Sequence, residues 1–275
     1  MPIISDQSLS IKQIIPLPLR SFYHRINWFI RNYNRIDKKS RLLSRHFHGP
    51  ISFDADGMTI SQNSDFISEE RFARAYQAAA ATNPWRGFSS QWRVYIICWM
   101  ADMVRHLPGD FVECGVNTGA YAKAIIEYTG FNRLGKTFYL FDTFDGLVLS
   151  QVSQEEWKAG IDRYADKYKN TYEAVCETFR NDQVRIIRGA VPDTLPECRS
   201  DKVAFLSIDM NCVEPEIAAI RYFYDKVVPG GVIVLDDYGF YKHIFQKKAF
   251  DAFAREKGIQ ILSLPTGQGI IFKQS

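Results

Sequence analysis

Apolar residues form regularly spaced blocks from residue 110 to the end of the chain. Strand-like runs lie at 110–114, 136–142, 184–189, 202–209, 230–237, 259–265 and 268–273. Segments with helical spacing separate the first five runs, among them 118–129, 153–179 and 214–227. Near-continuous apolar strands separated by helices predict a parallel sheet that is covered on both faces. The last two runs are joined by a short turn around Thr266 and Gly267, so they predict an antiparallel hairpin and complete a Rossmann-like α/β domain.

The pattern before residue 110 predicts helices and one small hairpin. Residues 68–82 and 91–107 have helical spacing, and Ser68 is a candidate N-cap of the first of these helices. Residues 49–66 predict a loop or a hairpin that turns at Asp56-Gly57. We therefore expect a mainly helical, basic and aromatic N-terminal extension over residues 1–90 and an α/β domain over residues 91–275.

Composition places the chain among globular proteins. The 275 residues suffice for one α/β domain with an extension, and 46% of them are hydrophobic against 24% charged. No apolar run approaches the roughly 18 residues that cross a bilayer, and the N-terminal run IIPLPL lacks the features of a signal peptide. Cys98, Cys114 and Cys212 lie in apolar stretches without CxxC spacing. These thiols are expected to be reduced core residues, which favours a cytoplasmic location.

The N-terminal extension carries a concentrated positive charge. Nine basic residues stand against Asp37 between residues 11 and 48, namely Lys12, Arg20, Arg25, Arg31, Arg35, Lys38, Lys39, Arg41 and Arg45. Aromatic residues are interleaved with them, among them Trp28 and Tyr33. The favoured interpretation is a solvated helix whose aromatic side packs on the α/β domain or on a partner subunit. Peripheral contact with an anionic membrane surface or an acidic polymer stays open.

The segment DFVECGVNTGAYA (110–122) combines a strand, a glycine turn and the start of a helix. Ligands of open α/β sheets bind at this edge, outside the carboxyl ends of the strands. The spacing G-x-x-x-G departs from the dinucleotide fingerprint, and an acid before the first glycine repels phosphate but suits a cationic or amino-bearing ligand. An acid after the second strand would accept hydrogen bonds from ribose hydroxyls. S-adenosylmethionine is therefore the predicted cofactor, with candidate residues Glu113, Gly115, Asn117, Thr118, Gly119, Asp142 and Thr143.

Three carboxylates end two neighbouring runs. Asp209 ends the fourth run, and Asp236 and Asp237 end the fifth. Adjacent strands lie about 4.8 Å apart, so these acids would reach one hard divalent cation, and Mg²⁺ suits a site that also binds a substrate oxygen. Such a metal would lower the pKa of a substrate hydroxyl and orient it toward the methyl donor. The alternative is that one Asp caps a helix and another contacts a backbone amide.

Four motifs together resemble one enzyme family. GDFVECGVNTGAYA, FDTFDGL, AVPDTLP and VPGGVIVLDDYG are similar to motifs of the TylF-type macrocin O-methyltransferases, over about residues 105–240. The resemblance implies the class I methyltransferase fold, dependence on S-adenosylmethionine and Mg²⁺, methylation of sugar hydroxyls of natural products, and a homo-oligomer. It assigns the metal to Asp209, Asp236 and Asp237, and the cofactor to Glu113 and Asp142.

The chain departs from this family after the fourth strand. The family commonly reads Asp-Gly-Asp there, with the second Asp proposed as general base, whereas this chain has Asp209, Met210 and Asn211. A side-chain amide cannot accept the proton. Glu214 matches a family position, and His243 is a candidate replacement because its pKa suits proton transfer. The candidate catalytic residues are therefore Asp209, Asn211 and His243.

Other functions remain open on the sequence. An NAD-linked oxidoreductase is disfavoured by the missing third glycine, and a non-catalytic protein that keeps the nucleoside pocket is disfavoured by the three acids. Nucleic-acid methylation ranks low because the Asp/Asn-Pro-Pro-Tyr signature is absent from the sequence. We expect a small, sugar-containing substrate and no nucleic-acid partner. Five aromatic residues are candidates for stacking on a sugar, namely Trp85, Phe88, Trp92, Trp157 and Tyr241.

Overall fold

The computed structural model describes residues 52–60 and 62–274 and divides into two units, Met1–Ser64 and Asp65–Ser275. The basic segment 11–48 therefore lies outside the described residues. In the first unit, β1 (Phe53–Ala55) and β2 (Met58–Ile60) form an antiparallel hairpin. Asp56 and Gly57 have φ angles of 52° and 77° at its turn, which confirms the hairpin predicted there.

The second unit is built on a seven-stranded sheet in the order β5-β4-β3-β6-β7-β9-β8. The first five strands along the chain are parallel: β3 (Asp110–Cys114), β4 (Phe138–Asp142), β5 (Val184–Arg188), β6 (Val203–Ile208) and β7 (Val227–Leu235). The last two are antiparallel: β8 (Leu262–Ser263) and β9 (Gly269–Phe272). This topology confirms the class I methyltransferase layout. Strand order reverses between β3 and β6, where ligands of such sheets bind.

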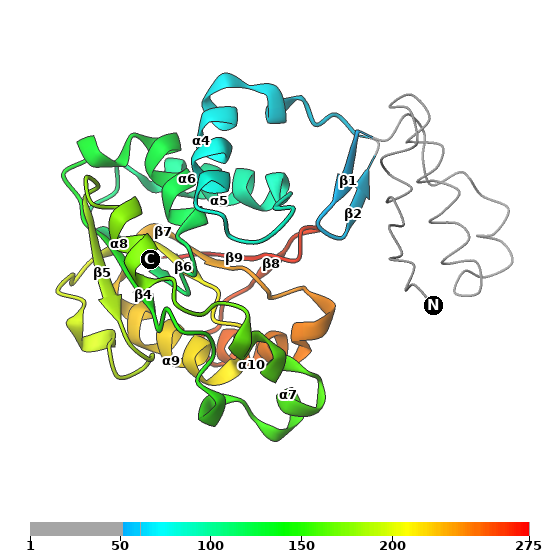
Figure 1. Cartoon of the computed structure of the whole chain (residues 1–275). Coiled ribbons are helices and arrows are strands. Elements are labelled where there is room, and N and C mark those ends of the chain that lie inside the picture. The colour runs from blue at the N-terminus through cyan, green and yellow to red at the C-terminus, as the bar shows by residue number, and fades with distance from the viewer. Residues whose placement is uncertain (1–51, 61, 275) are drawn as a thin grey trace, which may run out of the picture. The chain divides into compact units, whose positions relative to one another are not determined.

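Helices cover both faces of this sheet (Figure 1). One face carries α4 (Glu70–Ala81), α5 (Gln91–Val104), α6 (Ala120–Thr129) and α8 (Tyr172–Thr178), and the other carries α9 (Val213–Phe223) and α10 (Ile244–Lys257). Successive strand residues point to opposite faces, so Phe205 joins the first core and Leu206 the second. Burial on both faces explains why the strands are apolar at nearly every position.

Two helical predictions need correction. Helix α4 begins at Glu70 with Glu69 as its N-cap, because residues Asp65–Ser68 are already wound into a 3₁₀ turn (η3). Ser68 is therefore not the N-cap. Residues 153–179 do not form one long helix but α7 (Gln154–Lys158), a 3₁₀ segment η6 (Ile161–Asp166) and α8. Gly160 and Asn170 take left-handed conformations, with φ angles of 81° and 58°, and interrupt the helix.

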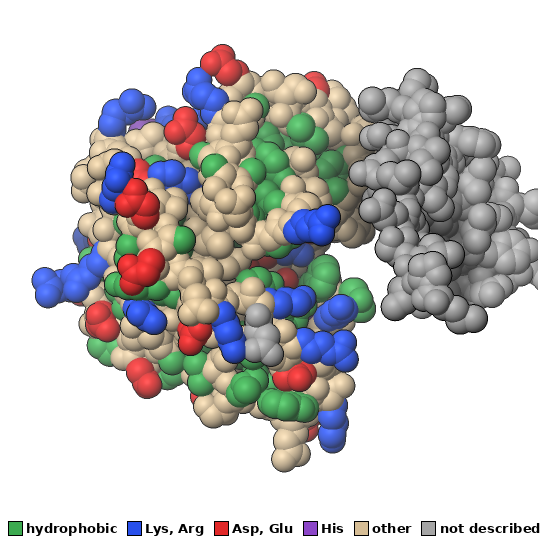
Figure 2. Space-filling view, in the orientation of Figure 1, with side chains coloured by type: hydrophobic (Ala, Val, Ile, Leu, Met, Phe, Trp, Pro, Cys, Tyr) green, Lys and Arg blue, Asp and Glu red, His purple; other side chains and the backbone are tan. Residues whose placement is uncertain are grey.

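Helix α4 packs against α6 and belongs to the second unit, which begins at Asp65. Residues 65–90, which the sequence analysis assigns to the N-terminal extension, are thus part of this unit. Cys98, Cys114 and Cys212 are buried free thiols, as the sequence predicts. No helix of the described residues has the length and apolarity to cross a membrane. Figure 2 shows Lys and Arg side chains beside Asp and Glu side chains over much of the described face, with several Lys and Arg side chains gathered at its lower right.

Candidate active site

The turn between β3 and α6 is held by the acid that ends β4. Asp142 Oδ2 accepts hydrogen bonds from the backbone N–H groups of Val116 at 2.6 Å and Asn117 at 2.8 Å, and its Oδ1 accepts one from Phe144 N–H at 2.6 Å. The sequence assigns Asp142 to ribose hydroxyls. Oδ2 already accepts two hydrogen bonds. Thr143 Oγ1 lies 3.3 Å from Oδ1 but gives its single proton to the backbone oxygen of Gly146 at 2.6 Å, so Oδ1 keeps capacity for a ligand. Asp142 therefore shapes the turn in addition to any contact with a nucleoside.

Glu113 is the buried acid at the end of β3, just before this turn. Its side chain is 2% exposed, and burial, with smaller contributions from Asp142 and Asp236, raises its pKa well above the ordinary range. Within the described part of the chain, Glu113 Oε2 has no hydrogen-bond partner. A buried acceptor without a donor is uncommon in a folded protein. This oxygen fits a ligand that brings an amino group, as S-adenosylmethionine does.

The two glycines bring the turn close to other parts of the fold. Gly115 and Gly119 have φ angles of 93° and 85°. A Cβ on Gly115 would stand 1.8 Å from the backbone oxygen of Asp209, and one on Gly119 would stand 2.3 Å from the ring of Phe179. The glycine at 115 thus lets the turn after β3 pass directly beside the end of β6, which joins the predicted cofactor turn to the carboxylates.

Two threonines predicted at the cofactor site have hydrogen-bond partners in the protein. Thr118 Oγ1 lies 2.9 Å from Thr82 Oγ1, at the end of α4. Thr143 Oγ1 donates to the backbone oxygen of Gly146 at 2.6 Å. Asn117 has a φ angle of 51°, so it contributes to the site mainly through the turn conformation that its backbone adopts. These side chains organise the loops around the site.

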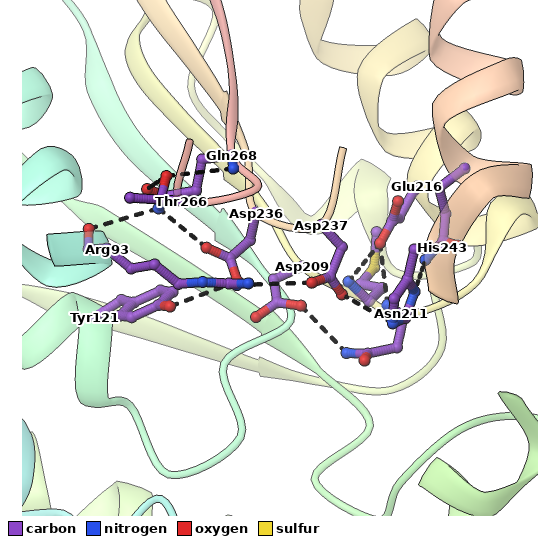
Figure 3. A network of polar contacts seen from close by, with 12 residues as sticks. Arg93, Tyr121, Asp209, Asn211, Glu216, Asp236, Asp237, His243, Thr266 and Gln268 are labelled. Atoms are coloured by element: carbon purple, nitrogen blue, oxygen red, sulfur yellow. Dashed lines mark hydrogen bonds and ion pairs between the residues drawn. The ribbon is translucent and has the colours of Figure 1, made fainter. Parts of the chain in front are cut away.

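The structure brings the three predicted metal acids together (Figure 3). Arg93 reaches toward them from α5, and its Nη1 lies 2.5 Å from Asp236 Oδ2 and 3.6 Å from Asp237 Oδ1. Gln268 lies directly before β9, and its Nε2 donates to Asp236 Oδ1 at 3.1 Å. Tyr121 of α6 also donates its hydroxyl to Asp236 Oδ2, at 3.4 Å. Asp236 thus has three partners from other parts of the fold, and none of them was predicted from the sequence.

Asp209 stands beside this pair and is partly exposed. Its Oδ1 accepts a hydrogen bond from Asn211 Nδ2 at 3.1 Å. Burial, and then the charges of Asp236 and Asp237, raise the pKa of Asp209 well above its ordinary range. Asn211 has a φ angle of 61°, a conformation that asparagine tolerates better than most residues. Asn211 therefore orients Asp209 instead of supplying a base.

A divalent cation fits the charge and donor type of this edge. Three carboxylates face one guanidinium, which leaves an excess of two negative charges when all three are ionised. Their oxygens are the hard donors that Mg²⁺ prefers, and a carboxylate oxygen that accepts a hydrogen bond keeps a second lone pair. As they stand, however, no three His, Cys, Asp or Glu side chains in residues 52–60 and 62–274 are arranged as a metal site. One reason is that Asp236 Oδ2 is engaged in the ion pair with Arg93.

His243, the candidate base, is only 1% exposed and faces an acid. Its Nε2 lies 3.5 Å from Asp237 Oδ2, and its Nδ1 lies 2.7 Å from Gln246 Nε2. With the amide of Gln246 as donor, Nδ1 accepts and the imidazole proton sits on Nε2, toward Asp237. In this tautomer, His243 orients Asp237 and has no free acceptor for a substrate proton.

Glu216 supports the loop that carries Asp209. It is 2% exposed, and it accepts hydrogen bonds from the backbone N–H groups of Met210 at 2.9 Å and Asn211 at 3.0 Å. Burial, with a contribution from Asp237, raises its pKa to about 8. Glu214, which the sequence placed at a family position, is exposed. The buried acid of this helix is thus Glu216, two residues further along the chain.

Comparison with known proteins identifies the family. The model of the macrocin-O-methyltransferase (TylF) family matches residues 97–263. The chain belongs to this family. It is 33% identical over 147 residues to demethyldecarbamoylnovobiocin O-methyltransferase of Streptomyces niveus, a match that covers 48% of this chain and 54% of the relative. It is 23% identical over 146 residues to mycinamicin III 3''-O-methyltransferase of Micromonospora griseorubida, covering 48% and 56%.

Solved structures of O-methyltransferases share the fold of this TylF-family chain. The O-methyltransferase NovP aligns with a TM-score of 0.58 at 24% identity, covering 66% of this chain and 80% of NovP. The calicheamicin methyltransferase CalS11 aligns with a TM-score of 0.57 at 17% identity, covering 82% and 100%. By contrast, the chain spans only about half the length of the curated relatives that it matches in sequence.

Proposed function

We propose that this protein is an S-adenosylmethionine-dependent O-methyltransferase that acts on a hydroxyl of a sugar or of a glycosylated metabolite. Membership of the TylF family supports the reaction class. The observation that supports the cofactor is at the end of β3, where Glu113 has a buried oxygen without a partner among the described residues. The names of the relatives, such as mycinamicin III 3''-O-methyltransferase, support a glycosylated acceptor.

The roles of the residues follow from their positions. Glu113 would accept a hydrogen bond from the amino group of the cofactor, and Asp142 Oδ1 one from a ribose hydroxyl. Asp209, Asp236 and Asp237 would hold a Mg²⁺ ion. When bound, the metal would lower the pKa of the acceptor hydroxyl. Magnesium dependence, a cytoplasmic location and a homo-oligomeric state belong to this proposal and rest on the resemblance and the buried thiols.

The family's proposed general base is an Asp at the position of Asn211, and no side chain takes over its role at that position in this chain. Asn211 donates its amide to Asp209, and His243 directs its imidazole toward Asp237. Neither side chain is placed to take up the proton of the substrate hydroxyl. We therefore expect the reaction to depend strongly on alignment of the two substrates and on the charge at the carboxylate edge, two effects that do not need a dedicated base.

Methyl transfer tests the proposal. Trideuteromethyl S-adenosylmethionine is incubated with the protein, Mg²⁺ and the acceptors of the named relatives. The masses of the products are then measured by mass spectrometry. We expect a labelled methyl group on a sugar oxygen and loss of product in EDTA. Asp209→Asn should abolish the product, whereas the exposed control Asp225→Asn should not. Equal turnover in EDTA and in Mg²⁺ would remove the metal from the proposal.

An NAD-linked oxidoreductase is the second candidate that the sequence left open. No observation on the structure favours it, because the acid Glu113 lies where a pyrophosphate would approach the turn. NAD titrated under the same conditions should therefore give no heat.

A further inference from the structure

Two tyrosines stand beside the carboxylates. Tyr164 belongs to η6, and Tyr168 follows four residues later. Their rings are parallel within 7°, with centroids 6.2 Å apart, and both side chains are partly exposed. The rings are stacked on one another, and Lys167 Nζ lies 4.7 Å from the centroid of the Tyr164 ring. The outer face of such a stacked pair can receive a ring of similar size. No sequence pattern distinguishes these two residues from the other tyrosines among the fourteen of the chain.

The segment η6, which carries Tyr164, is anchored by packing. Ile161 and Ala165 are buried, which anchors η6 to the rest of the unit. A Cβ added to Gly146 would stand 2.2 Å from the backbone oxygen of Ala165, so the segment packs directly on the turn that follows β4. That turn begins at Asp142, a predicted cofactor residue. The tyrosines are therefore held between the cofactor turn and the carboxylate edge by backbone packing.

Electrostatic and ring contacts connect the tyrosines to the carboxylates. Burial raises the pKa of Tyr168, and the charge of Asp209 adds to this effect, followed by Tyr164 and Asp237. The ring of Tyr164 lies 5.7 Å from that of His243, the residue that faces Asp237. A ligand that binds on these rings would thus have its hydroxyl groups within the field of the acids.

We propose that Tyr164 and Tyr168 form the acceptor subsite, on which the C–H face of a pyranose ring stacks while a hydroxyl points to Asp209. This inference rests on the proposed function. A pyranose has a weakly positive C–H face that suits the negative face of an aromatic ring, and hydroxyl groups that donate to carboxylates. Few precisely placed polar groups beside an aromatic surface are the usual composition of a small-ligand site.

Ligand-observed NMR with methyl α-L-rhamnopyranoside tests this subsite. Saturation transfer is measured for the protein with S-adenosylhomocysteine and Mg²⁺, and the affinity is obtained by titration. Tyr164→Leu and Tyr168→Leu keep apolar volume but remove the aromatic face, so each should weaken binding roughly tenfold. Tyr168→Phe keeps the ring and should bind like the wild type. Trp157→Leu tests a competing stacking candidate of the sequence, and Trp99→Leu is the matched control, because Trp99 is an aromatic residue of α5 that is 46% exposed.

Calorimetry with S-adenosylhomocysteine is run on every variant, and unchanged affinity shows that the fold and the cofactor site are intact. Rhamnoside binding that survives both leucine substitutions overturns the inference, as does a loss found only in Trp157→Leu. A wild-type protein that binds S-adenosylhomocysteine but not the rhamnoside, or that binds catechol in its place, also overturns it and leaves the methyltransferase proposal standing. Absence of S-adenosylhomocysteine binding would instead refute the proposed function.

Discussion

Among the described residues, Arg93 provides the only cation in direct contact with Asp236, and its removal should destabilise the fold. The side chains of the two residues are 8% and 4% exposed, and their charged atoms lie 2.5 Å apart. In Arg93→Met, Asp236 would remain buried beside Asp237 with Gln268 and Tyr121 as neutral partners. Methionine fills a similar volume, so the loss of charge is the main change.

The expected magnitude follows from burial. Removing one partner of a buried ion pair typically costs about 3–5 kcal/mol, because the other charge stays desolvated without compensation. Arg180→Met is the matched control, since Arg180 pairs with Glu177 at 2.7 Å while both side chains are more than half exposed. An exposed pair contributes about 0–1 kcal/mol. The two substitutions delete the same chemical group, so their difference isolates the effect of burial.

Urea unfolding followed by circular dichroism at pH 7 gives the free energies of unfolding. We expect Arg93→Met to lose at least about 2 kcal/mol more than Arg180→Met. The double variant Arg93→Met/Asp236→Asn should recover part of the loss, because the amide carries no charge. Equal losses in Arg93→Met and Arg180→Met, with an additive double variant, would refute the reasoning that the pair is buried and coupled.

Three further substitutions test other parts of the site. The pKa of Glu216 is raised to about 8 in the folded protein, so its contribution is fully present below its unfolded pKa of about 4.5 and is lost as the pH rises through 8. Glu216→Gln should flatten this decline, by at most about 1.4 kcal/mol per pH unit in urea unfolding between pH 5 and 8; an unchanged slope would contradict it. Gly115→Ala should lower the free energy of unfolding by more than about 1 kcal/mol and weaken S-adenosylhomocysteine binding, because its Cβ would collide with Asp209; wild-type values in melting and calorimetry would show that the turn yields easily. Asp142→Asn replaces one acceptor oxygen by an NH₂ group, which faces either the N–H of Phe144 or those of Val116 and Asn117, and should weaken the same binding about tenfold; undiminished affinity would mean that the turn keeps its conformation without this acid.

The sheet could be predicted because its signal is local and repeated. Each buried strand is a continuous apolar run, and each crossover contains a helical segment, so the order of elements implies parallel strands with a terminal hairpin. The interruption of residues 153–179 was harder to predict. Gly160 and Asn170 take left-handed conformations there, but neither residue type requires this conformation.

The carboxylate edge could be predicted in part for a geometric reason. Asp209 and Asp236 follow parallel neighbouring strands, whose carboxyl ends meet at one edge of the sheet. Arg93 is 143 residues from Asp236 along the chain, and no local pattern connects the two. An arginine within the apolar run of α5 was the available signal, because a buried charge needs a partner. Tyr164 is placed by backbone packing on Gly146, which the sequence does not reveal.

The central claim is that the turn after β3 binds S-adenosylmethionine, and calorimetric titration with S-adenosylhomocysteine tests it most directly. We expect saturable binding in the micromolar range, at least about tenfold weaker in Glu113→Gln, and no heat with NAD. Binding of NAD in preference to S-adenosylhomocysteine, or an affinity for S-adenosylhomocysteine that Glu113→Gln leaves unchanged together with no response to Asp142→Asn, would contradict the site assigned to the cofactor.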